Sequence, residues 1–130
     1  ELGPERLNDI APVRRLLDAG VNIGLATDNV PTTLFYPIWH VVSRWNMNSD
    51  DRVAPDQALN REDALRCGTM GGAYLTFEED KKGSLEEDKL ADMAVLSDDP
   101  LTCSEEAIKD IVAETTIVGG EVVYERDGTV

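Results

Sequence analysis

Apolar residues recur along the start of the chain at the spacing of one helix face. Intervals of three and four residues separate Leu7, Ile10, Val13 and Leu17. This pattern predicts a helix from Pro4 to Ala19, ended by Gly20. The run Val21 to Ala26 carries no charge and is typical of a short strand buried on both faces. A helix, a glycine turn and a buried strand form half of a βαβ repeat.

A second apolar stripe predicts a helix that begins near Pro37, because proline suits the first turn of a helix. Its members are Phe35, Ile38, Trp39, Val42 and Trp45. We expect these side chains to form core rather than a cofactor site, since such a stripe is typical of a core-facing helix. Residues 46–56 are polar and predict a loop.

A third helix is predicted to begin after Asn60, whose side chain suits an N-cap. Glu62 and Asp63 then lie in the first turn, where the helix dipole favours acids. The helix continues into a set of small residues, Gly68, Gly71, Gly72 and Ala73. Because small residues let a backbone approach its neighbour closely, we expect a tightly packed surface there.

From about residue 79 the pattern becomes β-rich. The predicted elements are a turn with a short strand over 81–86, a strand over 91–96, a helical turn from Ser104 to Ile108, and strands over 110–118 and 121–126. Gly119-Gly120 separates the last two and predicts a hairpin. We therefore expect an α/β fold class, with residues 1–78 alternating helix and strand and residues 79–130 mainly β.

The charge of the chain is strongly acidic. Its 130 residues are the size of one domain, and 26 acidic against 12 basic side chains give a formal net charge of −14. This field repels phosphate backbones and anionic lipid surfaces, so we expect no nucleic-acid or membrane partner. The acids gather in short clusters, such as residues 78–80 and 86–88. Such clusters indicate a solvated face or, as an alternative, a cation-binding surface.

The two cysteines, Cys67 and Cys103, are far apart and form no CxxC motif. We expect neither a zinc knuckle nor a disulfide, but reduced thiols in a cytoplasmic protein. No apolar run approaches the ~20 residues that cross a bilayer, and no signal peptide is visible. The sequence opens on Glu1 rather than Met, so we expect it to be cut from a longer chain.

Asp28 is the one candidate catalytic residue that the pattern supplies, because it directly follows the predicted buried strand. The C-terminal ends of strands in parallel α/β sheets and barrels collect ligands and catalytic groups. An acid there can bind a metal or accept a proton from water. Asp28-Asn29 is also a good turn or capping pair, so the residues alone leave both roles open.

Other candidate chemistry is sparse. His40 is the only histidine, and within a tryptophan-rich helix we expect it to be packed or at the surface rather than a metal ligand. The sequence contains no GxSxG elbow, no obvious base for either cysteine and no phosphate-binding glycine loop. The chain thus offers one plausible catalytic acid and no complete active site.

Three stretches carry a resemblance to known proteins: LLDAGVNIGLATDN (16–29), LNREDALRCGTMGGAYLTFEEDKKGSLEEDKLADMAVLSDDPL (59–101) and IVGGEVVYE (117–125). Together they resemble the C-terminal end of the amidohydrolase superfamily, in particular the amidohydrolase-3 group of metal-dependent hydrolases. The most specific part is the pattern G-S-L-x-x-x-K-x-A-D-x-x-V-L, which leads to the terminal glycine hairpin.

The resemblance implies a (β/α)8 TIM-type barrel flanked by a small β-sandwich. Residues 1–78 match the last α/β elements of the barrel, with Val21–Thr27 as its final strand, and residues 79–130 match C-terminal strands of the sandwich. The resemblance also implies that Asp28 binds a divalent metal, zinc above all, and shuttles protons to and from the hydrolytic water. For residues 68–77 it implies packing rather than chemistry.

Two departures from the family pattern are visible. Asp88 precedes Lys89 where many relatives have glycine, and a left-handed turn is less comfortable for aspartate than for glycine. The family's upstream HxH pair, its bridging Lys or Glu and its later histidines have no counterpart in the sequence. His40 matches none of them.

We therefore expect the C-terminal fragment of a metal-dependent amidohydrolase that hydrolyses amide-type C–N bonds, other than peptide bonds, in a small-molecule substrate. We expect the fragment alone to be inactive and metal-free, since a catalytic zinc needs about three protein ligands. Its partner would be the missing N-terminal barrel portion. The alternative is a non-catalytic binding or self-assembly module that keeps the fold. In either case, an exposed strand edge and apolar helix faces favour self-association.

Overall fold

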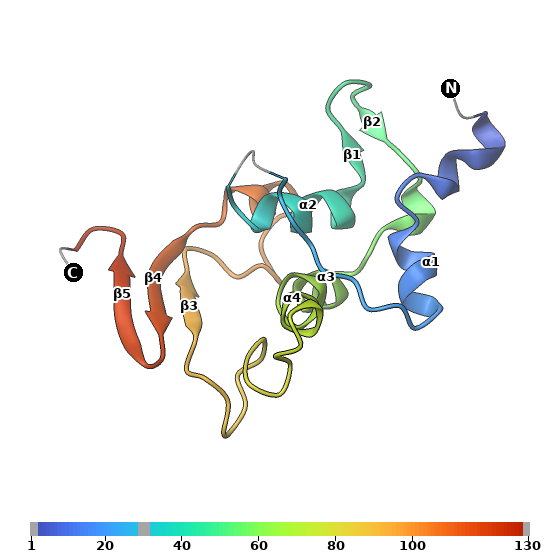
Figure 1. Cartoon of the computed structure of the whole chain (residues 1–130). Coiled ribbons are helices and arrows are strands. Elements are labelled where there is room, and N and C mark those ends of the chain that lie inside the picture. Colours follow the sequence, from blue (N-terminus) through green and yellow to red (C-terminus); the bar gives the residue numbers. More distant parts are fainter. Residues whose placement is uncertain (1–2, 29–31, 129–130) are drawn as a thin grey trace.

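The computed structural model describes residues 3–28 and 32–128. Its helical elements are η1 (Pro4–Asp9), α1 (Val13–Asp18), α2 (Phe35–Ser43), η2 (Pro55–Gln57), α3 (Arg61–Gly68), α4 (Met70–Leu75) and η3 (Glu106–Asp110). Its strands are β1 (Trp45–Asn46), β2 (Asp51–Arg52), β3 (Met93–Leu96), β4 (Ala113–Val118) and β5 (Glu121–Glu125). Figure 1 shows helices at the centre and right of the view and the sheet β3–β4–β5 at the left. None of the helices described is long and apolar enough to cross a membrane.

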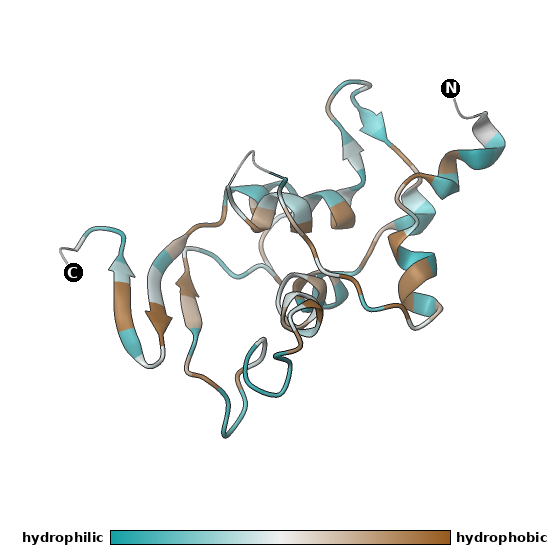
Figure 2. Ribbon diagram, viewed as in Figure 1, coloured by the Kyte–Doolittle hydropathy of each residue, from teal (hydrophilic) through white to brown (hydrophobic). Residues whose placement is uncertain are grey.

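The hydrophobic core forms where α2 packs against α3 and η3. Its buried members are Ile38, Trp39, Val41, Val42, Leu59, Ala64, Cys67 and Ile108. Ile38 and Trp39 are each 2% exposed, and the apolar turns of α2 stand out in Figure 2. The expectation that this stripe forms core is confirmed, although Trp45 at its end is only half-buried.

The first predicted helix is broken into η1 and α1, so the prediction of one helix from Pro4 to Ala19 is wrong. Ala11 has a φ of 44°, and proline at the next position disfavours helical geometry in the residue before it. The carbonyl groups at the break accept hydrogen bonds from an arginine side chain. The Arg44 guanidinium donates to the carbonyl oxygens of Ile10 at 2.8 Å and Ala11 at 3.3 Å, which fixes the bend.

Residues 21–27 form neither helix nor strand, and in Figure 1 they run as a long uncoiled stretch between α1 and α2. Gly20 ends α1 with a φ of 78° as predicted, but the predicted strand over Val21–Ala26 is wrong for this chain. A β-strand is defined by backbone hydrogen bonds to a neighbouring strand, and no strand among the described residues pairs with this segment. Instead, the Leu25 N–H donates to the Cys67 carbonyl of α3 at 3.2 Å.

The helical region that follows confirms the cap and corrects the length. The Asn60 side chain accepts a hydrogen bond from the Asp63 N–H at 2.8 Å, as an N-cap does. The single predicted helix is two helices, α3 and α4, separated by Thr69 with φ −115° and ψ −80°. The predicted loop over 46–56 contains the two-residue strand β2 and overlaps β1 and the short η2 at its two ends.

Replacing Asn60 with alanine is expected to lower the free energy of unfolding by about 1 kcal/mol, because the first turn of α3 loses its cap. Urea denaturation of the purified chain, followed by far-UV circular dichroism, measures this difference. Ser104 provides the comparison. Its hydroxyl accepts from the Ala107 N–H at a longer 3.3 Å before the short η3, so Ser104→Ala is expected to cost less. An equal or larger cost for Ser104→Ala would contradict the prediction.

The C-terminal sheet is antiparallel with strand order β3–β4–β5. Gly119 and Gly120 join β4 to β5 with φ values of 60° and 85°. Two successive positive φ angles are what a tight hairpin turn needs, so the predicted hairpin is confirmed. The strand predicted over 91–96 is also confirmed, since β3 lies within it.

The short strand predicted over 81–86 is wrong, because this region consists of turns and bends. The turn closes through the Leu90 N–H, which donates to the Lys81 carbonyl at 2.8 Å. Asp88 has a φ of 68°, so the left-handed conformation expected at this departure from the family pattern is present. Aspartate tolerates it better than most residues.

Candidate functional site

Asp28 ends the uncoiled 21–27 segment, and its side chain is exposed. Its φ is 50°, a left-handed conformation in which aspartate and asparagine are enriched among non-glycine residues. The chain therefore turns at this residue and leaves the carboxylate at the surface. Asn29, the other member of the predicted turn pair, lies outside the described residues.

The segment that leads to Asp28 is held on one side by the helices α3 and α4. Ile23 and Leu25 pack against the core cluster, and the Leu25 N–H bonds to Cys67. Between these two residues, Gly24 lies against α4 close to Gly71. The sequence pattern indicated a close packing surface on this helix but not its partner, which is the backbone of the segment that carries Asp28.

The residues described here do not make a metal centre by themselves. Nowhere in residues 3–28 and 32–128 do three or more His, Cys, Asp or Glu side chains gather closely enough to hold an ion. Asp28 offers one exposed carboxylate, and a zinc site needs about three protein ligands. The donor set of the described residues therefore does not fit a catalytic metal by itself.

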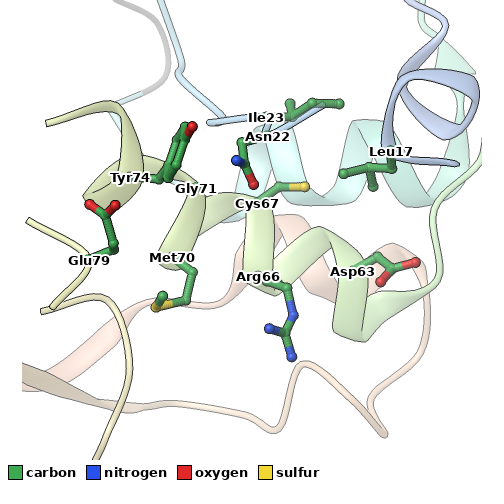
Figure 3. A pocket seen from close by; sticks show the side chains of 10 residues that line it. All are labelled: Leu17, Asn22, Ile23, Asp63, Arg66, Cys67, Met70, Gly71, Tyr74 and Glu79. Atoms are coloured by element: carbon green, nitrogen blue, oxygen red, sulfur yellow. The ribbon is translucent and has the colours of Figure 1, made fainter. Parts of the chain in front are cut away.

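A cavity of about 200 Å³ lies beneath the segment, and Figure 3 shows it between α1, residues 22–23 and the helices α3 and α4. Its lining residues are Leu17, Asn22, Ile23, Asp63, Arg66, Cys67, Met70, Gly71, Tyr74 and Glu79. Asp28 is not among them. Burial raises the pKa of the Cys67 thiol, and the nearby Asp63 charge acts in the same direction. A thiol held neutral is a poor nucleophile, so Cys67 is not activated for nucleophilic chemistry in this cavity.

Both cysteines are free thiols, so the expectation of no disulfide is confirmed. Cys103 is half-buried, and the Arg61 guanidinium lies 3.8 Å from its sulfur while also donating to the Pro100 carbonyl at 2.9 Å. The main partner of Arg61 is therefore the backbone that follows β3. This contact ties α3 to the C-terminal region.

His40 is packed within α2 and belongs to an aromatic group. Its ring meets that of Tyr36 edge-on at 4.8 Å between centroids and lies 4.8 Å from that of Trp39. Burial lowers the pKa of His40, the Arg44 charge adds to this effect, and a hydrogen bond with the Trp45 backbone opposes it. The imidazole borders a groove of about 800 Å³ between η1 and the β1–β2 hairpin. His40 is thus packed against aromatic rings and half-buried, which agrees with the expectation of a packed or surface residue.

The lowered pKa of His40 predicts a specific pH dependence of stability. The unfolded chain binds the proton near the ordinary value of 6.5, whereas the folded chain binds it only at lower pH. The free energy of unfolding is therefore expected to be constant above this value and to fall as the pH drops from 6.5 toward the folded pKa. Urea titrations at half-unit steps from pH 8 to 5 measure the slope.

His40→Phe is the control for this pH dependence, because phenylalanine keeps a ring beside Tyr36 and does not titrate. Since His40 is the only histidine, the variant should show a flat profile over the same window. The carboxylates whose pKa values are lowered, such as Asp9 and Glu78, titrate below it. A slope that survives in His40→Phe would contradict the assignment.

Residues 1–124 match the sequence profile of the Amidohydrolase family. The chain belongs to the Amidohydrolase family. It is 35% identical over 121 residues to the N-substituted formamide deformylase of Arthrobacter pascens, and the aligned region covers 91% of this chain and 22% of that protein. It is 38% identical over 87 residues to the imidazolonepropionase of Micrococcus luteus, covering 67% of this chain and 20% of the other.

Two further comparisons agree with this Amidohydrolase family membership. The 5-methylthioadenosine/S-adenosylhomocysteine deaminase of Natronomonas pharaonis is 31% identical over 130 aligned residues, covering 89% of this chain and 28% of that protein. The crystal structure of an amidohydrolase from Thermotoga maritima MSB8 superimposes with a TM-score of 0.63 at 25% identity, covering 88% of this chain and 26% of the other. The chain thus spans between a fifth and three tenths of the length of these relatives.

Proposed function

We propose that this chain is the C-terminal part of a metal-dependent amidohydrolase that hydrolyses amide-type C–N bonds other than peptide bonds in small molecules. The observation that carries the proposal is the family match over residues 1–124, combined with Asp28 exposed at the turn that ends the 21–27 segment. In the proposal, residues 1–78 supply the last α/β elements of a TIM-type barrel, and residues 79–130 supply strands of a flanking β-sandwich.

The chemistry assigned to Asp28 is proton transfer and metal binding. A bound divalent ion, for which zinc is the first choice, supplies Lewis acidity in hydrolases of this kind. The Asp28 carboxylate accepts the proton of the attacking water as the new C–O bond forms. It later delivers that proton to the leaving nitrogen as the C–N bond breaks, so that no proton is gained or lost. The remaining metal ligands come from the longer protein.

The unpaired backbone of residues 21–27 supports the barrel assignment. Among the described residues, only the N–H groups of Val21 and Leu25 donate backbone hydrogen bonds from this segment. A segment with uncharged residues and open backbone groups is suited to pairing with neighbouring strands on both sides. The names of two relatives support the substrate class, since one is an N-substituted formamide deformylase and the other a 5-methylthioadenosine/S-adenosylhomocysteine deaminase.

A self-associating module without catalysis is the second candidate, and exposed apolar side chains favour it. Phe77 is 89% exposed, Leu85 73% and Leu75 59%. Large apolar residues that are left uncovered invite another protein surface. This candidate needs no metal and no role for Asp28.

One experiment separates the two candidates. The 130-residue chain and the full-length enzyme that contains it are each assayed for bound zinc by atomic absorption and for hydrolysis of N-substituted formamides and related small amides. The proposal expects metal and turnover in the full-length enzyme and neither in the chain alone. Stoichiometric zinc with turnover in the isolated chain, or a full-length enzyme that hydrolyses no C–N bond, would overturn it. Concentration-dependent assembly of an inactive full-length protein, seen by ultracentrifugation, would favour the module.

A further inference from the structure

At Gly71 the backbone of α4 lies directly against the segment that carries Asp28. At Gly71 a Cβ atom would overlap the carbonyl oxygen of Ile23, and it would lie 2.9 Å from the carbonyl carbon of Ile23 and 3.2 Å from the Gly24 Cα. All three atoms belong to backbone and cannot rotate away as a side chain can. Figure 3 shows Gly71 on α4 next to residues 22 and 23.

We call the surface of α4 on which the backbone of Ile23 and Gly24 rests the seat, and two more contacts belong to it. A Cβ on Gly24 would lie 2.5 Å from the Leu75 Cδ1 and 3.5 Å from the Gly71 carbonyl oxygen. One residue further on, the Leu25 N–H donates to the Cys67 carbonyl at 3.2 Å. Three consecutive residues of the segment are thus fixed against one helical surface. By contrast, a Cβ on Gly72, the next residue of α4, would meet nothing within 4 Å.

We propose that Gly71 is a positioning residue, which sets the place of Asp28 by seating the backbone of Ile23 and Gly24 directly on α4. This inference rests on the proposed role of Asp28. Only three residues separate Gly24 from Asp28, and the chain turns at Asp28 itself. A displacement of the seat is therefore carried into the position of the carboxylate, and a misplacement of about 1 Å at a reacting group can cost roughly 10²-fold in rate.

The seat can be tested in the 130-residue chain without any assay of activity. Gly71→Ala and Gly72→Ala make the same change on the same helix, and both raise helix propensity equally. We expect Gly71→Ala to shift the amide resonances of residues 23–28, Asp28 included, and to speed hydrogen exchange at the Leu25 N–H by at least about tenfold. Gly72→Ala should leave both unchanged. Equal spectra of residues 23–28 in the two variants would overturn the proposal.

Gly24→Ala provides a second variant if Gly71→Ala does not fold. The new methyl would clash with the end of the Leu75 side chain at 2.5 Å, while the Gly71 carbonyl oxygen at 3.5 Å is an ordinary contact, so Leu75→Ala should relieve the clash. We expect Gly24→Ala to shift the Asp28 amide resonance and the double variant Gly24→Ala with Leu75→Ala to restore it. Failure of the double variant to restore the resonance, with Leu75→Ala alone close to wild type, would count against the seat.

The full-length enzyme gives the readout that links the seat to function. Gly71→Ala is expected to lower kcat by roughly 10²-fold with KM within about twofold, because the reacting group and not the substrate surface is displaced. Gly72→Ala should match wild type. A folded Gly71→Ala enzyme with full kcat would refute the positioning role, even where Asp28→Asn is inactive. An active Asp28→Asn enzyme would instead refute the proposed function and leave the seat as a structural contact.

Discussion

Asp28→Asn in the full-length enzyme is expected to lower kcat by about 10³-fold or more. Asparagine keeps the size of the side chain and tolerates the φ of 50° found at Asp28 as well as aspartate does. The variant therefore removes the negative charge and the proton acceptor without disturbing the turn. General acid–base catalysis alone contributes roughly 10²- to 10⁴-fold, and the loss of a charged metal ligand adds to this. Steady-state kinetics with a measurement of bound metal test the expectation.

Asp50→Asn is the matched control for this variant. Asp50 is also exposed and has a φ of 52°, but it lies in the β1–β2 hairpin, away from the 21–27 segment. The same substitution in the same backbone conformation is expected to leave kcat and metal content unchanged. An Asp28→Asn enzyme that keeps more than a tenth of the wild-type kcat would contradict the role of Asp28. So would an equal loss in Asp50→Asn, because it would show that the effect is not specific to the site.

Features decided by a few neighbouring residues could be predicted from the sequence. The Asn60 cap needs only its own side chain and the N–H three residues on, and the Gly119-Gly120 hairpin needs only two residues that accept positive φ. The break at Pro12 was also visible in the sequence. The apolar spacing of residues 7–17 continues across the proline, however, and by itself favours one helix over the break that the missing N–H produces.

The strand predicted over residues 21–26 failed for a different physical reason. The uncharged composition of residues 21–26 indicates that the segment is suited to burial. Whether it forms a strand depends on partner strands that are distant in sequence. The described residues supply a helix surface, through the contact of Leu25 with Cys67, but no neighbouring strand. Local residue preferences cannot tell a segment that is paired from one that is ready to pair.

The candidate site shows the same limit. From its neighbours alone, Asp28 could have been a turn residue, and the structure does place it in a turn with positive φ. The order of motifs along the chain, rather than the neighbours of Asp28, favours a role in chemistry, and this order agrees with the family match over residues 1–124. The close contact between Gly71 and the Ile23 carbonyl cannot be predicted from the sequence, because only the fold brings the two residues together.

Trp39→Ala is expected to lower the free energy of unfolding of the 130-residue chain by about 3–5 kcal/mol. Trp39 is 2% exposed and lies at the centre of the core, where α2 meets α3 and η3. Truncation removes most of its apolar surface and leaves a cavity that these helices cannot fill without moving. A loss of this size is a large part of the stability of a domain this small. Urea denaturation followed by circular dichroism at 222 nm measures it.

Two comparisons show whether packing is the cause. Trp45→Ala makes the same substitution at a half-buried position and is expected to cost clearly less, because less surface returns to water. Trp39→Phe is expected to cost less than about half of Trp39→Ala. The buried Trp39 Nε1 has no hydrogen-bond partner among the described residues, so phenylalanine removes an unsatisfied donor while keeping a ring in the core. If Trp39→Phe were as destabilising as Trp39→Ala, a hydrogen bond of the indole rather than packing would hold α2 in place.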